Sequence, residues 1–136
     1  MKKTFVFLLF LTQSCYAGDA IPDYMKIHEP FGAATCSSAY TQHEMDACGR
    51  KSLAMATKKM ELILAKLKKN HKAYEPKLFV LLEKDQASWE TYKTTGCEFE
   101  TYYSRNGSGY ESILNVCLET KVNERISYLQ WMLDHP

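Results

Sequence analysis

Apolar residues recur every three or four positions along most of the chain, which is the spacing of one face of an α-helix. The first such stretch opens with Thr41 and Glu44, which have the spacing of a capping box at a helix start. It ends before Pro76, because proline disfavours helical backbone at the residue preceding it. The pattern predicts a helix over about residues 41–72, whose buried face contains Met45, Cys48, Ser52, Met55, Met60, Ile63, Leu64 and Leu67.

Two further helical stretches follow. Pro76 suits the first turn of a helix, and residues 105–109 end that helix, with asparagine and glycine expected to supply a positive φ. The predicted buried face of this second helix contains Leu78, Leu81, Leu82, Trp89, Tyr92, Phe99 and Tyr103. Ser108 and Glu111 repeat the capping-box spacing and predict the start of a third helix. Its buried face contains Tyr110, Ile113, Leu114, Cys117, Leu118, Lys121, Arg125, Leu129 and Met132.

No stretch of any length alternates like a β-strand, and both helix connections are short, so consecutive helices are expected to be antiparallel. The predicted fold is all-α, a small antiparallel three-helix bundle. With 136 residues, 46% of them hydrophobic and 24% charged, the chain has the composition of one globular domain. That size disfavours a two-domain enzyme with a cofactor domain. The formal net charge of +1 gives no whole-chain excess of charge that would point to nucleic acid.

The N-terminus has the three parts of a secretory signal peptide. Basic residues precede an apolar run, residues 5–11, that is too short to span a bilayer of about 30 Å as a helix. Small and polar residues then continue to Ala17. We predict that residues 1–17 are a signal peptide cleaved after Ala17, which makes the mature protein periplasmic or secreted.

Acylation of Cys15 in a lipoprotein is the alternative processing. It fits less well, because Leu11 lies one position too far from the cysteine and Gln13 is bulky. Residues 18–35 contain two prolines and show no sustained period, so we expect an extended N-terminal arm. The helical domain then occupies residues 36–133.

Removal of the signal peptide leaves four cysteines, Cys36, Cys48, Cys97 and Cys117. An even number of cysteines in a small exported chain predicts two disulfides. The predicted helices bring all four to one end of the bundle, and that geometry permits more than one of the three pairings. We favour Cys36–Cys48, which ties the arm to the first helix, and Cys97–Cys117, which ties the second helix to the third.

An ordered set of residues carries a family resemblance. It consists of Cys36, Thr41, Glu44, Met45, Cys48, Leu82, Gln86, Trp89, Tyr92, Cys97, Gly107, Ser108, Cys117, Arg125 and Leu129. In this order and spacing the chain resembles the LprI-like lysozyme-inhibitor family over about residues 36–133. The resemblance implies a helical, disulfide-bonded, exported protein that binds and inhibits lysozyme, and the favoured pairing agrees with family members that carry only the first two cysteines. The family often has arginine where this chain has Lys93, and the two are not equivalent as hydrogen-bond donors.

The residues show no convergent catalytic group. The four histidines are scattered, with no two at the spacing of helical metal ligands. Glu98 and Glu100 are two residues apart on a helix, so they point to different faces and make a poor acid–base pair. We therefore expect no enzymatic activity, no metal and no cofactor, with a small hydrolase as a minor alternative. Gln86, Trp89 and Tyr92 lie on one helix face, and we interpret them as core packing rather than a sugar-stacking surface.

Charge is distributed unevenly. Residues 50–72 contain eight basic residues and one acid, whereas residues 83–124 contain eight acids and four bases. Cleavage removes two of the 17 basic residues and none of the 16 acids, which gives the mature chain a formal charge of −1. Many lysozymes are cationic, so the acidic second and third helices would favour docking. The alternative function is an envelope interaction or structural module that binds an anionic partner through the basic first helix.

The turn between the second and third helices supplies the partner-binding candidates. They are Tyr103, Ser104, Arg105, Asn106, Ser108 and Tyr110. The Cys97–Cys117 disulfide would brace this turn and lower the ordering cost of binding. We hypothesise that the turn enters a muramidase cleft, with Arg105 paired to its carboxylates. The pattern does not fix the oligomeric state.

Overall fold

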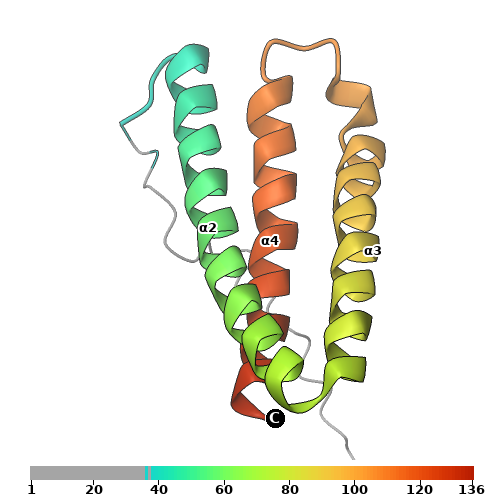
Figure 1. Cartoon of the computed structure of the whole chain (residues 1–136). Coiled ribbons are helices and arrows are strands. Elements are labelled where there is room, and N and C mark those ends of the chain that lie inside the picture. The colour runs from blue at the N-terminus through green and yellow to red at the C-terminus, as the bar shows by residue number, and fades with distance from the viewer. Residues whose placement is uncertain (1–35, 37) are drawn as a thin grey trace, which may run out of the picture.

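Three long helices make up the described part of the protein (Figure 1). The computed structural model describes residue 36 and residues 38–136. Its elements are α2 (Gln42–Tyr74), α3 (Pro76–Glu100), a short 3₁₀ helix η1 (Tyr102–Ser104) and α4 (Tyr110–Asp134). Consecutive helices run in opposite directions, so the predicted all-α antiparallel bundle is confirmed. The predicted signal peptide, Cys15 and the arm of residues 18–35 lie outside the described residues.

The start of α2 forms as the sequence predicts. Thr41 Oγ1 accepts a hydrogen bond from the backbone N–H of Glu44 at 3.2 Å, and the Glu44 carboxylate accepts one from the N–H of Thr41 at 2.9 Å. This reciprocal capping box satisfies two N–H groups that a helix start leaves without intrahelical partners. α2 continues slightly beyond the predicted end, to Tyr74, and Glu75 alone separates it from Pro76, the first residue of α3.

The connection between α3 and α4 differs from the prediction. α3 already ends at Glu100, where the N–H and the hydroxyl of Thr101 both donate to the carbonyl four residues earlier, at 3.0 and 2.7 Å. The predicted second capping box is wrong. Gly109 precedes α4 with a φ of −87°, no side chain caps the helix, and Glu111 forms an ion pair with Arg50 instead. Neither glycine of the connection has the expected positive φ, because successive hydrogen-bonded turns reverse the chain.

α2 packs chiefly against α4, and these two helices run parallel. Contacts between them advance together along both helices, from Gln42 with Ser112 to Ser52 with Glu119. The buried α4 residues at 115, 119, 122, 126 and 129 alternate steps of four and three, which is the spacing of a coiled-coil seam. We call the buried surface between these helices the α2–α4 seam. Its hydrophobic core contains Ala56, Met60, Ile63, Leu64, Leu67, Val122, Ile126 and Leu129.

The α2–α4 seam has an apolar half, toward the link at Glu75, and a polar half, toward the start of both helices. In the polar half the hydroxyl of Ser52 donates to the carboxylate of Glu119 at 2.8 Å, and both residues are buried. Nδ2 of Asn115 in this half is buried without a hydrogen-bond partner among the described residues, and so is Oδ1 of Asn123, which lies farther along α4 beside Val122 of the core. A buried polar atom left in this way costs about 1–3 kcal/mol. The apolar half therefore supplies most of the stabilisation between α2 and α4.

α3 is the least buried helix, which corrects several sequence predictions. Only Gln86 and Cys97 of its 25 residues are buried. Of the residues predicted to be buried in the second helix, Leu78, Leu81, Tyr92, Phe99 and Tyr103 are exposed. Met45 and Met55 of α2 and Ile113 of α4 were also predicted to be buried and are exposed. The physical reason is the arrangement of the helices. α2 crosses α4 at an angle, so it lies close to α3 near the link at Glu75 and away from it at the other end of the bundle (Figure 1). α3 therefore contacts its neighbours along a narrow side. Leu82 and Trp89 lie on that side and pack partly against the core.

Replacing Ser52 with alanine is expected to lower the free energy of unfolding by about 1–3 kcal/mol, because the buried Glu119 carboxylate loses its hydrogen-bond donor. The double variant Ser52→Ala/Glu119→Leu removes both polar groups and should be less destabilised than the single variant. Urea unfolding followed by circular dichroism measures both. Ser108→Ala, at an exposed position, is the control and should stay within about 0.5 kcal/mol of the parent. A double variant less stable than Ser52→Ala would contradict this account of the polar half.

Candidate functional site

Both disulfides lie at the end of the bundle where α2 and α4 begin. Cys36 is bonded to Cys48 with a Cα–Cα distance of 5.8 Å, and Cys97 is bonded to Cys117 with a distance of 5.7 Å. This is the pairing favoured from the sequence. The first bond holds the segment before α2 against that helix, and the second joins the end of α3 to α4. The covalent links therefore reinforce the end of the α2–α4 seam that is polar.

Residues 101–110, which connect α3 to α4 and include the first residue of α4, cap this end of the bundle, and we call them the tip. Thr101 is buried and hydrogen-bonded to α3, which fixes where the tip begins. Backbone N–H groups of Ser104, Gly107 and Tyr110 then donate to carbonyls three residues earlier, at 2.9, 2.9 and 3.2 Å. Every turn of the tip is thus closed by its own backbone bonds. With the Cys97–Cys117 disulfide beneath it, the tip is an ordered surface rather than a loose connection.

Two tyrosines and an arginine form the outer surface of the tip. Tyr103 is 96% exposed and its ring stands edge-on to that of Tyr102, with 5.7 Å between ring centroids. The guanidinium of Arg105 stacks on Tyr102 at 3.7 Å from the ring centroid and donates through Nη1 to the carbonyl of Tyr102 at 2.8 Å. Its other N–H groups make no hydrogen bond among the described residues. The arginine is held in one place and keeps donors available to a partner.

The other partner-binding candidates lie close to this surface. Asn106 and Ser108 are exposed, whereas Ser104 and Tyr110 are partly buried where the tip joins the bundle. A shallow groove runs beside the tip between the end of α3 and the first half of α4. It is lined by Glu100, Thr101, Ile113, Val116, Cys117, Thr120, Lys121 and Glu124. The tip and groove together present aromatic, apolar and acidic groups on one end of the molecule.

A polar cluster anchors the start of α2 to the start of α4 beneath the tip. Asp46 Oδ1 accepts hydrogen bonds from the hydroxyl of Ser112 at 2.5 Å and from the side-chain amide of Gln42 at 2.8 Å. These bonds favour the ionised carboxylate, so the Ser112 hydroxyl first and the Gln42 amide second lower the pKa of Asp46. The backbone N–H groups of Thr41 and Tyr40 lower the pKa of Glu44 in the same way.

Arg125 joins α4 to α3 in the middle of the bundle. Only 6% of its surface is exposed. Its Nε and Nη2 donate to Oε1 of Gln86 at 3.1 and 3.0 Å, and Nη2 also donates to Asp85 at 2.5 Å. The guanidinium carbon lies 5.5 Å from the ring centroid of Trp89 and 5.1 Å from that of Tyr128. The arginine is thus enclosed by α3 and α4 side chains and holds the two helices together.

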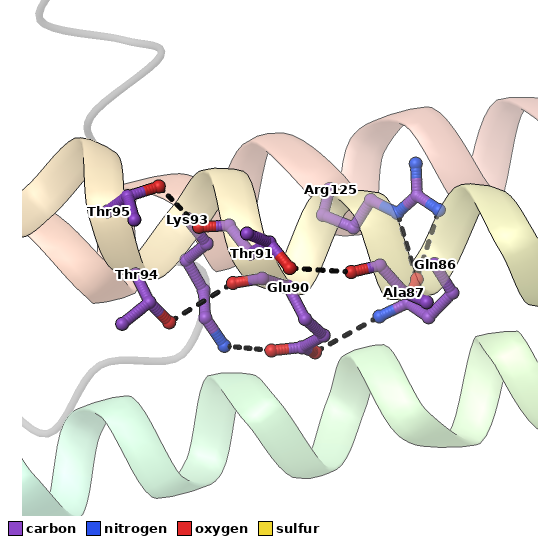
Figure 2. A network of polar contacts seen from close by, with 8 residues as sticks. All are labelled: Gln86, Ala87, Glu90, Thr91, Lys93, Thr94, Thr95 and Arg125. Atoms are coloured by element: carbon purple, nitrogen blue, oxygen red, sulfur yellow. Dashed lines mark hydrogen bonds and ion pairs between the residues drawn. The ribbon is translucent and has the colours of Figure 1, made fainter.

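The network around Arg125 continues along α3 (Figure 2). The amide of Gln86 donates to Glu90 at 3.2 Å, and the ammonium of Lys93 donates to the other carboxylate oxygen of Glu90 at 2.6 Å. Lys93 also lies 5.0 Å from the ring centroid of Trp89. Gln86 and Trp89 therefore serve packing between helices, as the sequence predicts. Tyr92 does not, since it is exposed and only Lys121 covers its ring, at 5.7 Å.

The structure also places the other residues that the sequence analysis considered. Among residues 36 and 38–136, no three metal-binding side chains gather in one place. Within the same residues, no helix is both long and apolar enough to cross a bilayer. Within the basic α2, Arg50 and Lys68 form ion pairs with Glu111 and Glu83. The remaining lysines of this helix lie at exposed positions, namely Lys51, Lys58, Lys59, Lys66, Lys69 and Lys72.

Some structural residues were not identified from the sequence. Asp85 was not recognised as the partner of Arg125, because the two are 40 residues apart in the chain. The apolar spacing of the sequence does not indicate that Asn115, Glu119 and Asn123 are buried. Their heptad-like spacing with Val122 and Ile126 is the signal that places Asn115 and Glu119 on the buried side.

The fold and its bonds define a small helical bundle braced by two disulfides. Within that class, the chain matches the family described as lysozyme inhibitor LprI over residues 33–129. It belongs to that family, and the resemblance noted from the sequence is confirmed. The matched region includes all four bonded cysteines, the Arg125 network and the tip. No match is found among curated proteins or among solved structures.

Replacing Arg125 with lysine is expected to lower the free energy of unfolding by about 1.5–3 kcal/mol, because an ammonium cannot serve Gln86 and Asp85 in the same fork geometry. The matched control is Arg50→Lys, whose ion pair with Glu111 is about half exposed and should contribute less than about 1 kcal/mol. Urea unfolding of both variants measures the difference. Equal losses of unfolding free energy in the two variants would show that the enclosed position of Arg125 does not increase its contribution to stability.

Acid is expected to weaken the hydrogen bonds of Asp46 that hold the start of α2 to the start of α4. The folded-state pKa of Asp46 lies below its ordinary value, so the stability it contributes is present above about pH 4 and is lost as the pH falls through the folded pKa. Asp46→Asn should therefore show a smaller drop in unfolding free energy between about pH 6 and about pH 3. Glu61→Gln, on the exposed side of α2, is the control and should keep the parental pH dependence. An unchanged drop in Asp46→Asn would argue against this role.

Proposed function

We propose that this protein inhibits a lysozyme by placing the tip in the substrate cleft of the enzyme. Family membership supports the activity, and one observation supports the site. Tyr103, 96% exposed, stands edge-on to Tyr102, and Arg105 is stacked on Tyr102 and hydrogen-bonded to its carbonyl. Since both are on a turn closed by backbone bonds and braced by a disulfide, little conformational entropy is lost when they bind.

The chemistry of a muramidase cleft suits these groups. Most glycoside hydrolases act with a pair of carboxyl groups on either side of the scissile bond. The unoccupied N–H groups of Arg105 would donate charge-assisted hydrogen bonds to such carboxylates. The ring of Tyr103 would fill space that a sugar ring otherwise occupies, with its hydroxyl able to reach polar groups at the edge. The inhibitor itself would need no catalytic group, and we propose that it has none.

The charge around the tip also supports binding of lysozyme at this end of the molecule. Glu98 and Glu100 are exposed at the end of α3, next to the tip, and the groove beside it is lined by two acids, Glu100 and Glu124, and one base, Lys121. A cationic lysozyme would be steered toward this acidic end of the molecule and away from the lysines of α2. The apolar residues Ile113 and Val116 in the groove would then contact the lip of the cleft.

The proposed function also requires an oxidising compartment outside the cytoplasm. Two disulfides in a small chain are typical of such compartments. We propose that residues 1–17 are a signal peptide removed after Ala17, and that the mature protein acts in the periplasm or outside the cell, where lysozymes act.

A cell-wall lysis assay tests the proposal. The oxidised protein, purified from the periplasm of an expression host, is titrated against c-, g- and i-type lysozymes, and a reduced sample is run in parallel. We expect saturable inhibition of at least one type near stoichiometric ratios, and weaker inhibition after reduction. No inhibition of any type at large excess would contradict the proposal. It would leave the exposed lysines of α2, as a surface for an anionic envelope partner, as the second candidate.

Variants of the tip test the site. Tyr103→Ala and Arg105→Ala should each weaken inhibition by about tenfold or more, because aromatic and arginine side chains supply most binding energy at such contacts. Neither change should alter the unfolding free energy by more than about 0.5 kcal/mol, since both side chains lie on the surface. Tyr74→Ala is the matched control, because Tyr74 is 86% exposed at the opposite end of the bundle. Full inhibition by Arg105→Ala would remove the proposed role of that residue.

A further inference from the structure

The outward face of α3 has no charged residue of its own over three helical turns, and the one ammonium near it is that of Lys121 on α4, 5.7 Å from the ring centroid of Tyr92. Between Lys84 and Glu98, the exposed residues on this face are Ala87, Ser88, Thr91, Tyr92, Thr94 and Thr95. The charged residues in the same stretch have other partners, since Asp85 binds Arg125 and Glu90 binds Lys93. A solvent-facing helix surface usually bears charged residues, so this uncharged face of α3 is unusual. We call it the threonine face.

The threonine face is also less polar than its sequence suggests. The hydroxyl of Thr91 donates to the carbonyl of Ala87 at 3.2 Å, that of Thr94 to Glu90 at 3.1 Å, and that of Thr95 to Thr91 at 2.6 Å (Figure 2). Each hydroxyl proton is thus used within α3 itself. The threonines keep their methyl groups for contact with a neighbour, and no donor on them is lost when water leaves this face.

The groups at the two ends of the threonine face are complementary to each other. Lys84 and Glu98 lie seven residues before and seven residues after Thr91. Both are exposed, and neither forms a hydrogen bond or ion pair among the described residues. Exposed apolar side chains lie just beyond or beside them, Leu81 near Lys84 and Phe99, 85% exposed, next to Glu98. An antiparallel copy of α3 centred on Thr91 would bring each lysine opposite a glutamate and each Leu81 within about one helical turn of a Phe99.

We propose that the threonine face binds the same face of a second copy of this chain, with the two α3 helices antiparallel and a two-fold axis at Thr91. The pairing is isologous, so it closes as a dimer and does not propagate. It forms two ion pairs, Lys84 with the partner's Glu98 and the reverse, around a neutral centre. A partner of different sequence would need this complementarity by coincidence, whereas a second copy supplies it through symmetry. One helix face buries a small area, below about 1,200 Å² in total, so the dimer is reversible.

Antiparallel pairing also places the two tips at opposite ends of the dimer. The tip begins directly after α3, beyond Glu100, and Tyr103 and Arg105 lie outside the threonine face. Each copy therefore keeps its tip accessible, and dimerisation does not depend on lysozyme binding. The proposal is independent of the proposed function.

Charge reversal tests the dimer in the oxidised, purified protein. Sedimentation velocity over a range of concentrations up to about 1 mM should show the parent mass rising toward that of two chains. Lys84→Glu and Glu98→Lys should each weaken self-association by about tenfold or more, because each places like charges opposite one another twice. Lys58→Glu, an exposed lysine of α2, is the matched control and should associate like the parent. Circular dichroism confirms that each variant is folded.

An equimolar mixture of Lys84→Glu and Glu98→Lys tests the register. In a mixed dimer both ion pairs are restored, one of them with its charges reversed, so association should recover to the parental level. A parent that stays monomeric at every concentration would overturn the proposal. Single variants that associate like the parent would overturn the role of these charges, and a mixture that stays monomeric would overturn the antiparallel register.

Discussion

The apolar half of the α2–α4 seam is the interaction on which the rest of the structure depends. Met60, Ile63 and Leu67 of α2 pack on Val122 and Leu129 of α4, and together with their neighbours they form the hydrophobic core. α3 adds no large apolar residue to that core beyond the partial contribution of Leu82 and Trp89. Its position follows from the one-residue link at Glu75, the hydrogen bonds of Arg125, and the Cys97–Cys117 disulfide.

The uneven distribution of apolar packing along the bundle explains where the disulfides lie. Toward the tip, the seam contains Ser52, Asn115 and Glu119, and the buried Nδ2 of Asn115 has no partner among the described residues. Packing there would hold the helix ends weakly. A disulfide typically stabilises a folded chain by about 2–4 kcal/mol, chiefly by restricting its unfolded state. The bonds thus compensate for weak packing at the end of the molecule where an ordered tip is needed.

The sequence predicts the number of helices, the capping box of α2 and the family, because these depend on local spacing and on ordered motifs. It predicts most of the buried face of α2, but not that of α3. Leu78, Leu81 and Phe99 recur at helical spacing, yet they are exposed, because α4 packs with α2 and leaves most of α3 uncovered. The Arg125–Asp85 bond joins residues far apart in the chain, and the stacking of Arg105 on Tyr102 depends on turn geometry. Both require the fold to be known.

The order of the disulfides along the chain has a consequence for how the protein matures. Among the four cysteines of the helical domain, Cys36 and Cys97 are each bonded to the next cysteine in sequence, across separations of 12 and 20 residues. In a chain that enters an oxidising compartment N-terminus first, Cys36 meets Cys48 before Cys97 has crossed. The two rings do not interlock, and short rings close at low entropic cost. In such a chain, oxidation of these four cysteines in their order of arrival would yield the native bonds directly, without reshuffling.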